Sequence, residues 1–167
     1  MDRINNIDGF RMPAEWEKQD STWIAWPHNK NDWPGLFANI PNVFREIILN
    51  ISKSQKVNLL VEEHKQIAKI KRFLLQKNIK LSKVHIHVVR TNRVWTRDTG
   101  PIYLINKKKN EKILLNWGFN AWAKYKDYQY DNSVPLQISN IQNIQSITPM
   151  IKIKSNSVPF VLEGGSI

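Results

Sequence analysis

The sequence has no cysteine among its 167 residues. This absence excludes disulfide bonds, thiolate metal sites and a cysteine nucleophile within these residues. The sequence also has no apolar run near the roughly 18 residues that a membrane span needs, and no leading segment with the pattern of a secretory signal. We therefore expect a cytoplasmic protein with no membrane partner.

Nucleotide-binding loops are absent as well. Neither GxGxxG nor GxxxxGK occurs, so a Rossmann or P-loop fold has no support. The four histidines are not spaced with carboxylates in a metal pattern, and we predict no metal and no cofactor. His85 and His87 are two residues apart on one predicted strand, where a polar strand face and a metal pair remain alternatives.

The charge is one-sided, with 25 basic against 14 acidic residues and a net charge of +11. A nucleic-acid module is one interpretation of such a balance, and its binding would weaken steeply with salt. The basic residues are spread along the chain, however, and the only run is Lys107 to Lys109, where a hairpin turn is expected. We favour lysines on solvated faces and predict no nucleic-acid partner.

Hydrophobic residues make up 41% of the sequence, which predicts a folded domain. Apolar periodicity predicts helices over 41–52 and 64–77, and a weaker one near 134–144. Short apolar runs predict strands over 22–26, 57–61, 84–89, 102–105, 113–117, 150–153 and 158–162. The runs beside the lysines predict a hairpin. The alternation predicts an α/β protein, although paired strands between helices spoil a clean βαβ series.

Two carboxylates stand where catalytic groups are often found, at the ends of predicted strands. Asp98 lies in the segment 95–101 (WTRDTGP), where Gly-Pro would fix the backbone turn. Glu163 leaves an apolar strand and enters a glycine pair, which lets a backbone or a ligand come close. Together with the flat face of Trp95, the two carboxylates predict a cradle for a planar cation, because a guanidinium presents forked donors.

Each of these residues also has a structural interpretation. Asp98 could cap a turn, and Glu163 could be a solvated strand end. Arg97, next to Asp98 in the chain, could form half of a structural ion pair. The residues alone leave these alternatives open.

The sequence resembles the agmatine deiminases of the bacterial-type peptidyl-arginine deiminase family, guanidino-group-modifying enzymes. The motifs that carry the resemblance occur in the family's order at 12–16 (MPAEW) with 22–28 (TWIAWPH), 95–101 (WTRDTGP), 117–122 (WGFNAW) and 160–167 (FVLEGGSI). One departure is Ala123, where the family leads us to expect glycine.

The resemblance implies a fold that the residues alone do not predict. That fold is the five-bladed α/β propeller, or pentein, built from ββαβ-like modules around a central site. Residues 1–167 would be the N-terminal portion of a single catalytic domain, supplying roughly the first two blades and the start of the third. Its edges would then be uncovered, and we expect the isolated chain to self-associate, aggregate or be partly ordered.

The resemblance also implies a reaction. Agmatine is hydrolysed to N-carbamoylputrescine and ammonia through a covalent amidino-cysteine intermediate, in polyamine (putrescine) metabolism, with putrescine biosynthesis and agmatine catabolism both left open. Asp98 and Glu163 match the family's catalytic carboxylates, which also bind the guanidinium, and Trp95 matches an aromatic residue that lines the site. The family's G-H-x-D segment and its cysteine come later than Ile167, so we expect the isolated chain to be inactive.

Three alternatives follow from the same residues. The chain could work with a separately encoded C-terminal half, it could be a non-catalytic guanidinium-binding remnant, or it could be a fragment of a peptidyl-arginine deiminase-type enzyme. The 117–122 segment offers no arginine pair for a substrate carboxylate, and this favours agmatine. A homo-oligomer remains open.

Overall fold

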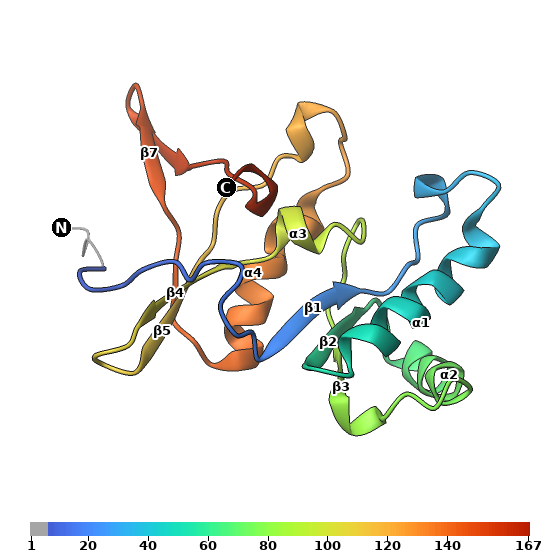
Figure 1. The fold of residues 1–167 in the computed structure, drawn as a ribbon. Coiled ribbons are helices and arrows are strands. Elements are labelled where there is room, and N and C mark those ends of the chain that lie inside the picture. The colour runs from blue at the N-terminus through green and yellow to red at the C-terminus, as the bar shows by residue number, and fades with distance from the viewer. Residues whose placement is uncertain (1–6) are drawn as a thin grey trace. The chain divides into compact units, whose positions relative to one another are not determined.

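The structure, a computed structural model, describes residues 7–167, which divide into two compact units. Unit 1 contains the described residues up to Glu17 together with 97–128 and 132–167, and unit 2 contains 18–96 and 129–131. No helix of the described residues is long and apolar enough to cross a membrane. Figure 1 shows the elements of both units.

Unit 2 is built on a parallel three-stranded sheet in the order β1-β2-β3. The strands are β1 (Ser21–Ala25), β2 (Lys56–Val61) and β3 (Val84–Val88), and the connections are the helices α1 (Ile40–Ile51) and α2 (His64–Leu75). All five elements match the sequence prediction within one or two residues. This half of the chain is a clean βαβαβ series, so the expectation that paired strands interrupt the alternation does not apply to it.

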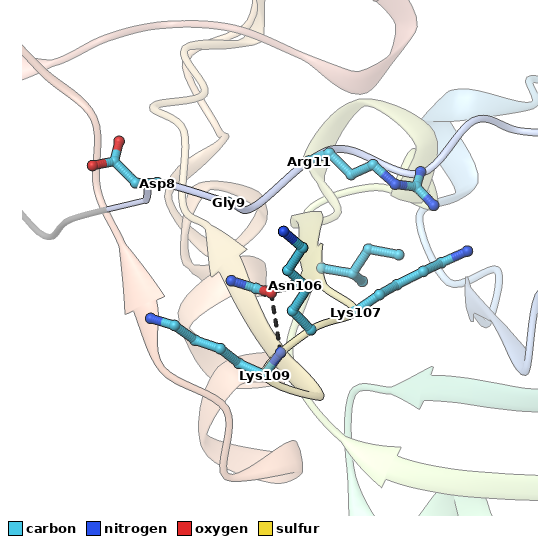
Figure 2. Close-up of a pocket in the computed structure, with 8 residues that line it drawn as sticks. Asp8, Gly9, Arg11, Asn106, Lys107 and Lys109 are labelled. Atoms are coloured by element: carbon cyan, nitrogen blue, oxygen red, sulfur yellow. Dashed lines mark hydrogen bonds between the residues drawn. The ribbon is translucent and has the colours of Figure 1, made fainter.

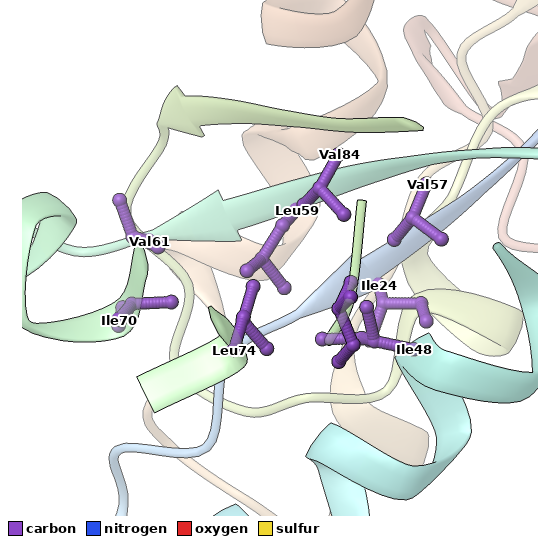
Figure 3. Packing of buried hydrophobic residues seen from close by; sticks show 9 residues of the cluster. Ile24, Ile48, Val57, Leu59, Val61, Ile70, Leu74 and Val84 are labelled. Carbon is purple, nitrogen blue, oxygen red and sulfur yellow. The ribbon is translucent and has the colours of Figure 1, made fainter. Parts of the chain in front are cut away.

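The core of unit 2 lies between α1, α2 and one face of the sheet. Alternate residues of β2 point into it, as Figure 3 shows for Val57, Leu59 and Val61. Ile48 from α1 and Leu74 from α2 pack against them and are fully buried. The apolar stripe predicted for α1 is wider than its buried face, because Val43 and Ile47 are 51% and 40% exposed.

Unit 1 contains the predicted hairpin. Strands β4 (Ile102–Asn106) and β5 (Glu111–Leu115) pair in antiparallel register, with Ile102 opposite Leu115, and the three lysines lie in the turn. The short strand β6 (Ser146–Ile147), which the sequence did not predict, adds to β5 in parallel. On the other edge Arg11 forms a bridge with Ile105.

The helix α4 spans Gln129–Gln142 and begins five residues before the predicted start. The prediction placed Pro135 in the first turn, where proline is best tolerated, but the structure has it inside the helix. A second hairpin, β7 (Met150–Ile153) with β8 (Asn156–Pro159), ends three residues before the predicted limit. The residues that follow it carry Glu163.

Candidate functional site: a pair of carboxylates in unit 1

Asp98 lies in α3 (Thr96–Thr99), a single helical turn in a segment where the sequence predicts a loop. Its side chain is partly buried. The neighbouring Arg97 does form an ion pair, as one alternative held, but its partner is Glu15 near the start of the chain. The Asp98 carboxylate therefore has no bidentate arginine partner among the ion pairs of the described residues.

Glu163 is positioned by a short backbone ladder. The Gly118 amide donates to the Phe160 carbonyl at 2.9 Å, and the Leu162 amide donates to the Gly118 carbonyl at 3.2 Å. A side chain at Gly118 would lie only 3.2 Å from the Pro159 Cβ atom, so glycine permits this pairing. The ladder ends at Leu162, and the next residue, Glu163, turns toward α3.

The glycine pair after Glu163 brings the backbone against α3, the first of the two close approaches, by backbone or by ligand, that the sequence left open. A Cβ atom on Gly164 would lie 2.5 Å from the Arg97 carbonyl oxygen, a distance that no side chain could occupy. A Cβ atom on Gly165 would lie 3.1 Å from Asp98 Oδ1 and 3.6 Å from Glu163 Oε1. The Asp98 and Glu163 carboxylates therefore both lie beside Gly165 within unit 1, and their role as a binding pair stays a prediction.

The electrostatics of this pair favour a cation. Burial raises the pKa of the Asp98 carboxyl above its ordinary value, and the charge of Glu163 and a hydrogen bond between the two side chains raise it further. Glu163 Oε2 is buried and has no hydrogen-bond partner among the described residues. Two close carboxylates with an unused buried acceptor are unfavourable alone, and a planar cation would supply both the missing charge and the missing donors.

Trp95, the third predicted site residue, belongs to unit 2. There the Arg93 guanidinium lies over its ring, with Arg93 Cζ 5.1 Å from the ring centroid. Arg93 itself is 7% exposed, and its Nε atom lies 3.2 Å from Asp32 Oδ1. One face of the indole thus already carries a cation from the chain.

The segment before Trp95 is fixed by hydrogen bonds exchanged with the start of α4, which the sequence analysis missed. Asp131 Oδ1 accepts hydrogen bonds from the Asn92 amide at 2.7 Å and the Arg93 amide at 3.2 Å. In return Asn92 Oδ1 accepts from the Tyr130 amide at 2.9 Å, in the first turn of α4, whose own N-cap residue makes no side-chain cap. These partners are 38 and 39 residues apart, so no local pattern could reveal them.

Asp131 is 1% exposed, and burial raises the pKa of its carboxyl to about 6, although the amides of Asn92 and Arg93 and the charges of Arg93 and His28 lower it. Its Oδ2 atom has no hydrogen-bond partner among the described residues. Asp131 is thus a buried acid whose hydrogen bonds hold the 92–93 backbone in place.

The 117–122 motif contains the most unusual backbone of unit 1. Ala121, Trp122 and Ala123 have φ angles of 50°, 56° and 56°, three consecutive left-handed residues without a glycine. Such a conformation costs about 1–2 kcal/mol for each residue with a Cβ atom. The missing glycine noted at Ala123 therefore has a structural meaning, because glycine adopts this conformation freely.

Two pockets of the described residues lie away from all three predicted site residues. One, of about 430 Å³, lies between the 8–11 segment and the β4–β5 turn, lined by Asp8, Gly9, Arg11, Ile105, Asn106 and the three lysines. Figure 2 shows the hydrogen bond in which Asn106 Oδ1 accepts from the Lys109 amide, at 3.1 Å. Asn106 is the only buried polar side chain among the residues that line this pocket, and it stabilises the β4–β5 turn. The pocket therefore offers no buried polar group to a ligand.

Comparison with known proteins decides the family. The family model of the Porphyromonas-type peptidyl-arginine deiminases matches residues 11–167. The chain belongs to that family. Among curated members, a protein of Mycoplasma capricolum that is provisionally named agmatine deiminase is 33% identical over 165 residues. A Yersinia pestis protein with the same provisional name is 32% identical over 166 residues.

Solved structures of the deiminase family agree with this fold. The agmatine deiminase of Enterococcus faecalis superposes with a TM-score of 0.76 at 29% identity, over 95% of this chain and 40% of its own. A substrate-bound agmatine deiminase of C. jejuni, in which a cysteine is replaced by serine, superposes with a TM-score of 0.71 at 26% identity, over 94% of this chain and 42% of its own. The mixed α/β fold is therefore that of the deiminases, as predicted.

The match covers the two proteins unequally. It includes 96% of this chain but only 41% of the M. capricolum protein and 40% of the Y. pestis protein. The chain spans about two fifths of the length of the curated relatives it matches.

Proposed function

We propose that this chain supplies the guanidinium-binding carboxylates of an agmatine deiminase. The observation that carries the proposal is the Asp98–Glu163 pair beside Gly165, with a buried Glu163 oxygen that lacks a donor among residues 7–167. The relatives named as agmatine deiminases support the choice of substrate. Trp95 keeps the role that the family resemblance gives it, an aromatic residue that lines the site, as a prediction.

In the proposed reaction a cysteine thiolate forms a bond to the guanidinium carbon of agmatine. One terminal nitrogen then takes up a proton, its bond to that carbon breaks, and it leaves as ammonia. Water then adds to the amidino carbon, the thiol departs, and N-carbamoylputrescine is released. Forming the covalent intermediate divides a difficult substitution into two easier steps. Asp98 and Glu163 hold the guanidinium in one orientation throughout, so that the attack begins from an ordered complex.

None of the 167 residues is a cysteine, so the thiolate must come from other residues than these. We propose that residues other than these 167, on the same or on a separate polypeptide and equivalent to the rest of the family's propeller, supply it together with the histidine of the G-H-x-D segment. The chain alone then binds agmatine without hydrolysing it. Purified chain that released N-carbamoylputrescine at enzyme-like rates would refute this proposal, and activity restored by a separately expressed C-terminal half would identify a split enzyme.

Binding is tested directly by calorimetry of the purified chain with agmatine. Asp98→Asn and Glu163→Gln each remove one charge from the pair and should abolish measurable binding. Glu111→Gln is the matched control, because Glu111 is an exposed carboxylate on β5 of the same unit. Equal affinity in the wild type and in Asp98→Asn would show that the pair is not the binding site.

The family description leaves a peptidyl-arginine substrate as the second candidate, because the same carboxylates would hold either guanidinium. The two are separated by titrating N-acetyl-arginine, whose carboxylate is free, beside agmatine. We expect agmatine to bind more tightly, since the 117–122 segment lacks the arginine pair that a carboxylate-bearing partner would need.

A further inference from the structure

Asp131 is the most deeply buried charged residue among those described, and the proposed function gives it no role. Its carboxylate accepts the amides of Asn92 and Arg93, and Asn92 Oδ1 accepts the amides of Tyr130 and Asp131 at 2.9 Å and 3.3 Å. Four hydrogen bonds therefore join the two segments, all within unit 2. A buried acid is a costly choice for a purely structural link, because an asparagine would offer the same acceptor without a charge to desolvate.

The segment that Asp131 holds leads directly to Trp95, and it is fixed on both sides of that residue. Before Trp95, the buried Thr91 donates its amide to Glu62 Oε1 at 3.1 Å. After Trp95, Thr96 Oγ1 donates to the Trp23 carbonyl at 3.2 Å. The backbone around Trp95 therefore has little freedom of its own, and the position of the ring depends on what lies against it.

Arg93 is the residue that lies against it. Its amide is held by Asp131, and its guanidinium is held at the other end, with Nε 3.2 Å from Asp32 Oδ1. The guanidinium carbon lies 5.1 Å from the centroid of the Trp95 ring. Because both ends of Arg93 are fixed, the cation meets the indole in one place. Losing the hydrogen bonds to Asp131 would release the backbone under Arg93, and the ring would lose a fixed neighbour.

We propose that Asp131 is a positioning residue of the guanidine site, which keeps the Trp95 indole in its binding orientation through the 92–93 backbone and Arg93. The inference rests on the proposed function, in which Trp95 lines that site. A side chain that is already ordered contributes affinity because less freedom is lost when the ligand binds. An ionised carboxylate accepts amides more strongly than a neutral one, so protonation of Asp131 should weaken its hold on the segment.

The charged groups that face Asp131 come from the ends of neighbouring strands. Arg93 and His28 place positive charge near it, and they have carboxylate partners of their own, Asp32 beside Arg93 and Glu62 Oε1 at 3.6 Å from His28 Nε2. Burial outweighs the two positive charges and raises the pKa of the Asp131 carboxyl to about 6. Histidines ordinarily titrate in the same range, so the test must separate Asp131 from His28.

The test follows the indole N–H signal of Trp95 in the nitrogen-15-labelled chain, identified by its loss in Trp95→Phe. In the wild type this signal should move with pH around a midpoint of about 6. His28→Gln should keep that transition, whereas Asp131→Asn should remove it because its side chain does not titrate. The folded state of each variant is checked by circular dichroism.

Calorimetry with agmatine at neutral pH then measures what the position of Trp95 contributes. Asp131→Ala leaves two amides without their acceptor and should weaken binding at least about fivefold, whereas Asp131→Asn keeps an acceptor of the same shape and should bind within about twofold of the wild type. Ile70→Val is the control for stability, because it alters the core of unit 2 instead, and it should change neither the Trp95 signal nor the affinity.

A wild-type Trp95 signal that does not respond to pH would overturn the inference, as would a transition that disappears in His28→Gln. An affinity loss in Asp131→Ala that Ile70→Val matches would also overturn it, since stability alone would then be responsible. Asp98→Asn separates these failures from failure of the proposed function. If the wild type does not bind agmatine, or if Asp98→Asn binds as the wild type does, the proposed function fails and the inference falls with it. If Asp98→Asn abolishes binding and Asp131→Ala leaves it intact, only the inference fails.

Discussion

Replacing Ala123 by glycine should stabilise the protein, although the same exchange destabilises most helical turns. Ala123 is exposed and has a φ of 56°, so the substitution removes a Cβ penalty and loses almost no buried surface. The penalty removed is about 1–2 kcal/mol. The added freedom of glycine in the unfolded chain costs about 0.5–1 kcal/mol. At the midpoints of these two ranges the net gain is about 0.75 kcal/mol.

For a chain of this size such a gain corresponds to a rise of about 1–4 °C in the melting temperature. Circular dichroism or calorimetric melting would detect it at constant protein concentration. The matched control is Ala68→Gly, an exposed alanine inside α2, which should lower stability by about 1 kcal/mol. The two variants should move the melting temperature in opposite directions. If Ala123→Gly destabilises the chain as Ala68→Gly does, the left-handed turn is not strained and the reasoning from its φ angles is wrong.

The remaining predictions concern the carboxylates. Gly165→Ala should weaken agmatine binding at least about tenfold, because the new Cβ atom would lie 3.1 Å from Asp98 Oδ1. Gly35→Ala is the control. Gly35 has open space around it but a positive φ of 74°, so this exchange should affect only stability. Agmatine affinity should fall on acidification, and at higher pH than for an ordinary aspartate, because the pKa of Asp98 is raised. Asp131, with a pKa of about 6 against 3.8, binds its proton more tightly in the folded state, so its contribution makes the chain less stable as pH rises from about 4 to 6. That contribution is on the order of 2–3 kcal/mol. It should vanish in Asp131→Asn, so a plot of this variant's unfolding free energy against pH should be flatter than the wild-type plot. An unchanged pH dependence in Asp131→Asn would contradict the prediction.

The sequence was sufficient where one local pattern determines one element. In unit 2 the helices and strands are close to their predicted limits because each has a single apolar face or a short apolar run bounded by turn residues. The capping box of Glu63 and Gln66 at the start of α2 is a signal of this local kind. The parallel pairing of the strands follows from the helices between them.

In unit 1 and at the start of α4 the local signals were weaker than the tertiary ones. The start of α4 is fixed by Asn92, 38 residues away from Tyr130. Pro135 inside the helix is a residue that normally marks a first turn, and this made the sequence prediction begin too late. The two residues of β6 exist as a strand because β5 offers an edge to pair with. Neither feature leaves a periodic pattern in its own segment.

The carboxylate pair was predictable because each member follows a distinctive motif, and the glycine pair after Glu163 indicated a close approach. The contacts of the neighbouring residues Arg97 and Trp95 were not predictable. Arg97 pairs with Glu15, which lies far away in the chain, and the position of Arg93 over the Trp95 indole depends on side-chain packing. The left-handed turn had left one trace, an alanine where the family resemblance leads us to expect glycine. Its strain became evident only from the φ angles.

Asp98 and Glu163 acting together as a receptor for a guanidinium is the central claim. The most direct measurement is a carbon-13 NMR titration of the side-chain carboxyl signals of the chain against pH, with and without agmatine. We predict that Asp98 titrates above its ordinary range in the free chain and that saturating agmatine lowers its pKa, because the bound cation favours the ionised form. An Asp98 signal that titrates at the ordinary value and does not respond to agmatine would contradict the central claim.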